Sequence, residues 1–186
     1  DHPLNQIQPG FWYAAPESKL YDERPDPMPS GNTQAVMKAW SSAAFDTKRN
    51  RLIIWGGGHG DYAGNELYIF DVASLSWQRI WGPTPSDQIQ DSSMGQQETY
   101  LDGNPVSRHT YDGLVYLPEP YDALWAQAGS RYPFGYGTYA TWLFSFKDLT
   151  WTQLSDCPES HLGISSAYDP VSGHVFLKSL YQMYEY

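Results

Sequence analysis

Four short apolar runs follow one another in the first half of the chain, and each is separated from the next by residues that favour turns. The runs are rich in β-branched and aromatic residues and span positions 44–46, 51–55, 65–71 and 76–80. Asp, Asn, Gly and Ser occupy the breaks, where they satisfy or relax turn backbone. The pattern predicts a four-stranded antiparallel meander.

The same unit recurs further along the chain. Gly56 and Trp77 are 21 residues apart, and Gly129 and Trp151 are 22 residues apart. A third copy runs over 166–186, where the sequence stops within its third strand. A repeated sheet of this kind buries its faces only against neighbouring copies, so we expect the copies to stack face to face.

The order of key residues within the first copy points to a family. A hydrophobic strand is followed by a Gly-Gly pair at 56–57, then by an aromatic residue, Phe70, and by Trp77. This order resembles the kelch repeat of galactose-oxidase-type β-propellers over about residues 36 to 186. The resemblance implies an all-β fold, a kelch-like β-propeller of which about two and a half four-stranded blades are present. A β-sandwich is the alternative, because regular short strands suit it as well.

We interpret the chain as one partial propeller domain and as a fragment of a larger assembly. Its predicted parts are an N-terminal segment, two blades and an incomplete blade, at 1–35, 36–81, 107–155 and 161–186. In the second blade, Phe146 is matched with Phe70 of the first. Closed propellers contain four to eight blades, so we expect further blades or other subunits to cover the open faces. Trp12, in a segment similar to the fourth strands, is predicted to close the last blade.

Composition narrows the location and the partners. The chain has 8 Trp and 15 Tyr and only 17% charged residues, which favours an extracellular, periplasmic or surface-associated β protein. The net charge of −10 argues against nucleic acid, whose affinity comes from neutralised phosphates. No run approaches the roughly 18 apolar residues of a membrane span. The single cysteine, Cys157, excludes an internal disulfide and is interpreted as a small buried residue.

Blade geometry predicts where a site would form. The loop between strands 2 and 3 and the linker into the next blade emerge on one face, because each strand reverses direction. The first loop, 59–65, begins with His59, and the linker 107–112 contains His109. His161 occupies the equivalent position in the third copy. Three histidines are therefore predicted to point toward one pocket. No HxH or HxxxH spacing is present, so a divalent metal held by them is the lesser alternative to no cofactor.

Residues from these segments supply the candidate chemistry. The candidate catalytic residues are His59, His109, Tyr62, Tyr111 and Arg108. The candidate substrate-binding residues are Asn65, Asp61, Arg131, Tyr132 and Tyr136. Aromatic rings beside Asn, Asp and Arg suit a carbohydrate, because a ring covers the apolar face of a sugar while polar groups bind its hydroxyls. Structural roles are the alternative: Asn and Asp cap loops, and tyrosines wedge between blades.

Three functions are compatible with this face. Copper-radical oxidation, known from galactose oxidase, is disfavoured because the chain has no Tyr-His dipeptide and Cys157 falls near a strand end. A polysaccharide lyase acting by β-elimination needs a His or Tyr base and a group that neutralises a uronic carboxylate, and both are available. The acidic net charge disfavours an anionic polymer unless Arg108 and Arg131 create a local positive site. The alternative is a noncatalytic protein-interaction or structural surface propeller, and catalysis stays open at this point.

Overall fold

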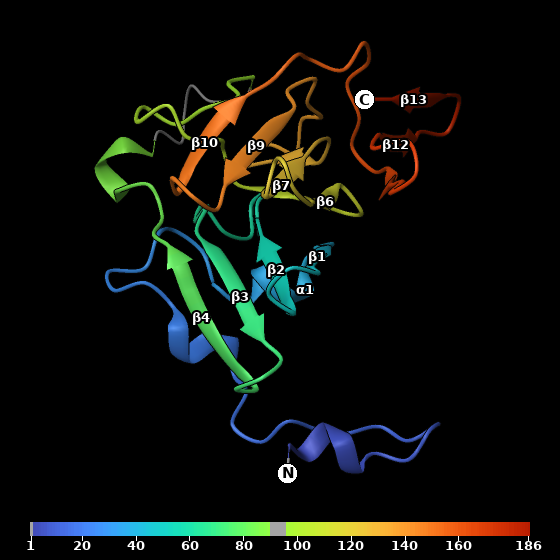
Figure 1. The fold of residues 1–186 in the computed structure, drawn as a ribbon. Helices are drawn as coiled ribbons and strands as arrows, with labels where there is room; N and C mark the ends of the chain where they lie inside the picture. Colours follow the sequence, from blue (N-terminus) through green and yellow to red (C-terminus); the bar gives the residue numbers. More distant parts are fainter. Residues whose placement is uncertain (1, 90–95) are drawn as a thin grey trace.

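The computed structural model describes residues 2–89 and 96–186 (Figure 1). It is all-β, as predicted, with four antiparallel sheets and almost no helix. The helical elements of the described residues are short: η1 (Pro3–Gln6), η2 (Leu20–Glu23), α1 (Ala35–Lys38) and η3 (Ser86–Gln88). No helix within these residues is long and apolar enough to cross a membrane.

The first sheet is the meander that the sequence predicts. Its strands are β1 (Ala43–Asp46), β2 (Arg51–Trp55), β3 (Leu67–Asp71) and β4 (Ser76–Trp81), paired in that order and all antiparallel. Side chains fix the tight turns: Asp46 accepts hydrogen bonds from the backbone N–H groups of Lys48 and Arg49. Asp71 does the same for Ser74. The aspartate side chains therefore stabilise these turns by local hydrogen bonds to the turn backbone.

The second sheet repeats the first. Its strands are β6 (Leu114–Leu117), β7 (Ala123–Ala126), β9 (Trp142–Ser145) and β10 (Thr150–Gln153), again an antiparallel meander. Trp77 pairs with Phe70 across β3 and β4, and Trp151 pairs with Phe144 across β9 and β10. The two tryptophans are thus equivalent, as predicted. The match of Phe146 with Phe70 is wrong, because register makes Phe144 the equivalent residue.

Two smaller sheets complete the described structure. The third sheet consists of β11 (Ser165–Tyr168), β12 (Val175–Lys178) and β13 (Met183–Glu185). A two-stranded sheet joins β5 (Arg108–His109) to β8 (Ser130–Arg131). The sequence pattern did not predict this pair, because two-residue strands carry no readable alternation.

The three larger sheets stack in chain order. One apolar cluster joins the first sheet to the second and includes Ile53, Trp55, Leu124 and Phe144. Another joins the second sheet to the third. Figure 1 shows this succession, from teal and green through yellow and orange to red. Because the second sheet is buried on both faces, the arrangement differs from a two-layer sandwich. The described residues form no closed propeller.

The outer faces differ in how they are covered. The N-terminal segment lies over the first sheet, where Leu20 and Val36 pack against Ile54. On the third sheet, Ala167 and Lys178 are exposed. Residues 11–15 form no strand, and the Trp12 side chain is fully exposed. Closure of the ring by Trp12 and coverage by further blades stay predictions.

Candidate functional site

Loops from all three large sheets meet at one end of the stack, which we call the loop face. It consists of the β2–β3 loop, the linker into β6, the β7–β9 loop and the linker into β11, at 56–66, 107–113, 127–141 and 159–164. Backbone hydrogen bonds join them: the Gly57 N–H donates to the Arg108 carbonyl at 2.9 Å, and the Gly129 N–H donates to the Leu162 carbonyl at 2.9 Å. The structure therefore brings these segments together.

His59 and His109 lie side by side on this face. Their ring centroids are 5.1 Å apart and the rings meet edge to face. His59 is exposed and has a φ of 51°, a left-handed conformation that is uncommon outside glycine. The absence of a side chain at Gly135 makes room for it, since a Cβ there would lie 2.4 Å from the His59 ring. The β7–β9 loop thus holds the imidazole in place.

His109 is the buried member of the pair. Its side chain is 1% exposed, and its Nε2 atom lies 2.7 Å from Oδ2 of the exposed Asp61. A carboxylate only accepts hydrogen bonds, so Nε2 donates and Nδ1 of the neutral ring carries the lone pair. Among the described residues Nδ1 has no hydrogen-bond partner. Burial lowers the pKa of His109, and the hydrogen bond to Asp61 only partly opposes this effect. The ring is therefore neutral at pH 7.

Two aromatic residues complete the cluster around His109. The Trp40 ring centroid lies 5.2 Å from that of His109, and the Tyr111 centroid lies 6.3 Å from it. Trp40 is 65% exposed, although its ring contacts a buried residue. The Tyr111 N–H donates to the Trp40 carbonyl at 2.7 Å. We call Trp40, His59, Asp61, His109 and Tyr111 the histidine cluster.

Sequence reasoning missed Trp40, but the repeat contained a signal for it. Trp40 stands five residues before Phe45, and Tyr111 stands five residues before Tyr116, the matched residue of the second copy. Both Trp40 and Tyr111 have positive φ, at 45° and 49°. An aromatic residue at this step of the repeat is thus presented to the loop face in both copies.

Two arginines lie beneath the loop face. Arg108 and Arg131 are buried and face each other across β5 and β8. Glu98 is 3.0 Å from Nη1 of Arg131 and 3.8 Å from Nη2 of Arg108. Burial lowers the pKa of Arg108 to about 10. Among the described residues, one carboxylate lies between the two guanidinium groups.

The arginines are already engaged by the protein. Arg131 donates from Nη1 to the carbonyls of Gln96 and Gln97, and from Nη2 to that of Gly137. Arg108 donates weakly to the carbonyls of Val106 and Ala128, at 3.3 and 3.4 Å. Arg108 is closed off from a ligand, whereas Arg131, with a side chain 7% exposed, lines a surface pocket beside Tyr136.

Three predicted residues lie inside the protein instead of at the site. Tyr62 is fully buried and donates its hydroxyl hydrogen to Glu66 at 2.8 Å, and burial raises its pKa far above the ordinary value. The side-chain amide of Asn65 donates to Thr84 and to the Pro105 carbonyl, and its oxygen accepts from the Thr84 N–H. Tyr132 is buried in an apolar cluster. Each is placed for packing or loop closure, whereas Tyr136 is exposed on the loop face.

The three-histidine metal set is not assembled. His161 is buried against Tyr184 of β13, with ring centroids 5.6 Å apart, because the linker into β11 turns it toward the third sheet. Within residues 2–89 and 96–186, no group of three or more His, Cys, Asp or Glu side chains is arranged to hold a metal ion.

Comparison of the sequence with protein-family models and with curated proteins finds no match in either set. The likeness to kelch repeats therefore rests on the residues of the chain itself, and the function has to be argued from the site.

Proposed function

We propose that this chain is part of an extracytoplasmic kelch-like β-propeller whose loop face binds a carbohydrate. The stacked meanders support the propeller, because the second sheet packs against a neighbouring sheet on both faces and the first two sheets direct their strand 2 to strand 3 loops to the same end. The low charged fraction and the many aromatic residues support the location. The binding function rests on the histidine cluster.

The observation that carries the proposal is the exposed Trp40 ring beside fixed polar side chains. An exposed tryptophan covers the apolar face of a sugar ring, and neighbouring polar atoms accept or donate hydrogen bonds to the hydroxyls. His59 and Asp61 are exposed. Both contact His109, which also contacts the Trp40 ring. Asp61 in turn is held by its hydrogen bond to His109. The site is thus ordered before a ligand arrives, which limits the entropy lost on binding.

Further exposed aromatic side chains extend this surface along the β7–β9 loop. They are Phe134, Tyr136 and Tyr139. Successive aromatic rings on one face suit an oligosaccharide, because each ring can cover one sugar unit. A protein partner is the competing proposal, since exposed aromatic residues are also enriched in protein interfaces.

β-Elimination is a second candidate, favoured by the Asp61–His109–His59 arrangement. In that reaction His59 would accept the proton beside a uronic carboxylate as the carbon–oxygen bond to the leaving group breaks, and Tyr111 would protonate the leaving oxygen. His109 is too deeply buried to touch the substrate and would act by positioning. The two candidate groups for the carboxylate, Arg108 and Asn65, are buried and engaged. Binding is therefore better supported than turnover.

The test is a glycan array followed by calorimetric titration of each oligosaccharide that binds. Replacing Trp40 by Ala is expected to weaken binding at least tenfold, because the stacking surface is lost. Trp12→Ala is the matched control, since this tryptophan is also exposed but lies outside the loop face. Affinity should also fall in the double variant His59→Ala, His109→Ala.

Turnover is measured separately by ultraviolet absorbance of unsaturated uronate over a panel of polysaccharides. Product formation that disappears in His59→Ala would establish the lyase. The carbohydrate proposal is overturned if no glycan binds the folded protein, or if Trp40→Ala and the double variant both retain full affinity.

A further inference from the structure

A surface pocket of about 320 Å³ lies on the loop face. Its walls come from the β7–β9 loop, from the linker into β11 and from the segment that precedes β5. Tyr136 and Tyr139 line it with side chains that are 50% and 51% exposed, and Ser160 lines it as well and is exposed. The volume far exceeds the roughly 15 Å³ that a cavity needs to hold one water. We call this space, which has room for a sugar ring, the tyrosine pocket.

Hydrogen bonds between separate segments fix the walls of the tyrosine pocket. The Thr138 hydroxyl donates to Glu98 at 2.6 Å, and Arg131 donates to the Gly137 carbonyl at 2.8 Å. A Cβ at Gly137 would lie 2.7 Å from Oγ of Ser160, so the glycine lets the linker into β11 approach the β7–β9 loop closely. Tyr136 and Tyr139 flank this fixed stretch. An ordered backbone therefore presents both rings, which limits the entropy lost when a ligand binds.

The charges in the lining of the tyrosine pocket cancel. Glu98 and Arg131 are the only charged residues among those that line it, and they are paired at 3.0 Å. Arg131 also donates to three backbone carbonyls, so little of its hydrogen-bonding capacity remains for an anion. The net charge of −10 opposes an anionic ligand as well. The lining therefore suits an uncharged ligand.

The tyrosine pocket continues the surface of the histidine cluster. Gly135, the neighbour of Tyr136, is the residue whose missing side chain makes room for the His59 ring. His59 in turn contacts His109, which contacts Trp40. Among the described residues, no ring contact joins Trp40 directly to either tyrosine of the pocket. A ligand that touches both Trp40 and the pocket must therefore extend past His59, which requires more than one sugar unit.

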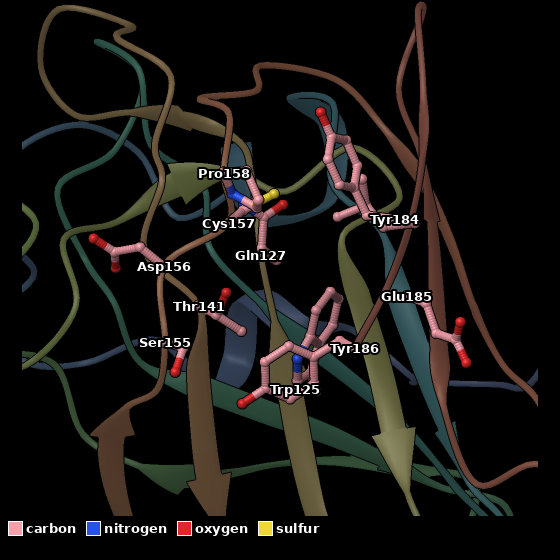
Figure 2. A pocket seen from close by; sticks show the side chains of 11 residues that line it. Trp125, Gln127, Thr141, Ser155, Asp156, Cys157, Pro158, Tyr184, Glu185 and Tyr186 are labelled. Atoms are coloured by element: carbon pink, nitrogen blue, oxygen red, sulfur yellow. The ribbon is translucent and has the colours of Figure 1, made fainter.

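The cavity between the second and third sheets offers no comparable site (Figure 2). Its volume is about 200 Å³, and Trp125, Gln127 and Tyr186 are among the residues that line it. The indole N–H of Trp125 and the amide of Gln127 are fully buried, so a ligand in that cavity cannot reach them. In the tyrosine pocket, by contrast, the side chains that would meet a ligand are exposed.

We propose that the loop face binds a neutral oligosaccharide, with one unit on Trp40 and another in the tyrosine pocket. In the pocket, the rings of Tyr136 and Tyr139 cover the apolar face of a sugar. Hydroxyl groups both donate and accept hydrogen bonds, so those of the tyrosines and of Ser160 bind the hydroxyls of the sugar. The inference rests on the proposed function and narrows its ligand to a chain of uncharged hexoses.

The experiment measures affinity against ligand length. Oligomers of glucose, galactose and mannose, from the monosaccharide to the hexasaccharide, are titrated by calorimetry, and by ligand-observed NMR where binding is weak. In at least one series the hexasaccharide is expected to bind about tenfold more tightly than the monosaccharide. The double variant Tyr136→Ala, Tyr139→Ala should abolish this gain and leave the monosaccharide affinity unchanged. Trp40→Ala should weaken binding at both lengths.

Tyr121→Ala is the matched control, because Tyr121 is 60% exposed but lies in the β6–β7 turn at the opposite end of the stack. It should leave every affinity unchanged. Near-ultraviolet circular dichroism checks folding, and if the double variant does not fold, the two single variants decide the matter by the same loss of the length dependence.

Two failures are distinguishable. If a glycan binds and Trp40→Ala weakens it, but the tyrosine variants retain full affinity for the hexasaccharide, the pocket is not part of the site and only this inference falls. The inference also falls alone if an oligogalacturonate binds as tightly as the galactose oligomer of the same length. If no glycan of any kind binds the folded wild-type protein, the proposed function falls with it.

Discussion

The two ends of the sheet stack differ in how completely their polar side chains are hydrogen-bonded. At the turn end, formed by the β1–β2 and β6–β7 turns, Asp46 and Asp122 are shared between cationic side chains. Arg49 donates to both, at 2.9 Å to Asp46 and at 2.6 Å to Asp122. At the loop face, by contrast, Nδ1 of His109 and Nη2 of Arg108 are buried and form no hydrogen bond within the described part of the chain.

The turn end gains stability from its arrangement. Arg51 also donates to Asp46, at 2.8 Å, and the Tyr116 hydroxyl donates to Asp122 at 2.9 Å. The hydrogen bond from Arg49 holds the pKa of Asp122 well below its ordinary value. Because these groups come from the first and second sheets, their pairing fastens one sheet to the other.

The difference separates a region whose polar groups stabilise the fold from one whose buried polar groups contribute little to it. A buried polar group that is unsatisfied lowers stability, typically by about 1–3 kcal/mol. The comparison predicts large stability effects at the turn end and small ones where polar atoms are left unpaired.

The largest expected effect is at Asp46, whose side chain is fully buried. Asp46→Ala removes the acceptor for Arg49 and Arg51 and for two backbone amides of the turn. The free energy of unfolding should fall by about 4 kcal/mol, as expected when a buried ion pair loses one partner. Urea denaturation measures this value. The exposed Asp87 is the control, and Asp87→Ala should change stability by less than about 0.5 kcal/mol.

An intermediate effect is expected from comparing two buried amides. Asn65 forms three hydrogen bonds through its side chain, whereas Gln127 forms none with the described residues. Asn65→Leu should lower the free energy of unfolding by about 3 kcal/mol, at about 1 kcal/mol for each bond. Gln127→Met should leave it unchanged or raise it, because no hydrogen bond is lost. Equal losses in both variants would contradict the comparison.

The smallest expected effect is a pH dependence at His109. Burial lowers its pKa in the folded state, and Asp61 opposes this only in part, so the unfolded chain binds the proton more readily. The neutral ring therefore contributes stability above the unfolded pKa of about 6.5, and this is lost as the pH falls through that value. In His109→Phe this loss is absent. As the pH is lowered from 8 to 5, the wild type should therefore lose stability relative to the variant. Urea midpoints of both proteins at each pH measure this difference.

The same contrast explains what the sequence could predict. The meanders were readable because alternation and turn residues act locally, and Trp77 and Trp151 matched because the repeat fixes their register. The loop face was readable because strand direction alone decides where the loop of His59 emerges. Burial was not readable: Tyr62 and Tyr111 are the same residue type in similar loops, yet only packing against the N-terminal segment places the first in the core.

Partners supplied by distant segments were equally hidden. Nothing local in the sequence marks Glu98 as the acceptor between two arginines or Asn65 as the clamp of its loop. Trp40 stood in the pattern as the counterpart of Tyr111, but its ring contact with His109, which lies 69 positions away, could not be read locally.

The close contact at Gly58 has a consequence for engineering. A Cβ at this position would lie 2.3 Å from the Cα atom of Arg108, so the backbone there tolerates no side chain. The contact pins the start of the β2–β3 loop, while the next positions, His59 to Asp61, are exposed. A library that keeps Gly58 and varies Asp61 freely, with Trp40 and His59 limited to residues that tolerate their positive φ, would therefore present new side chains on an anchored loop, as the variable loops of a binding scaffold do.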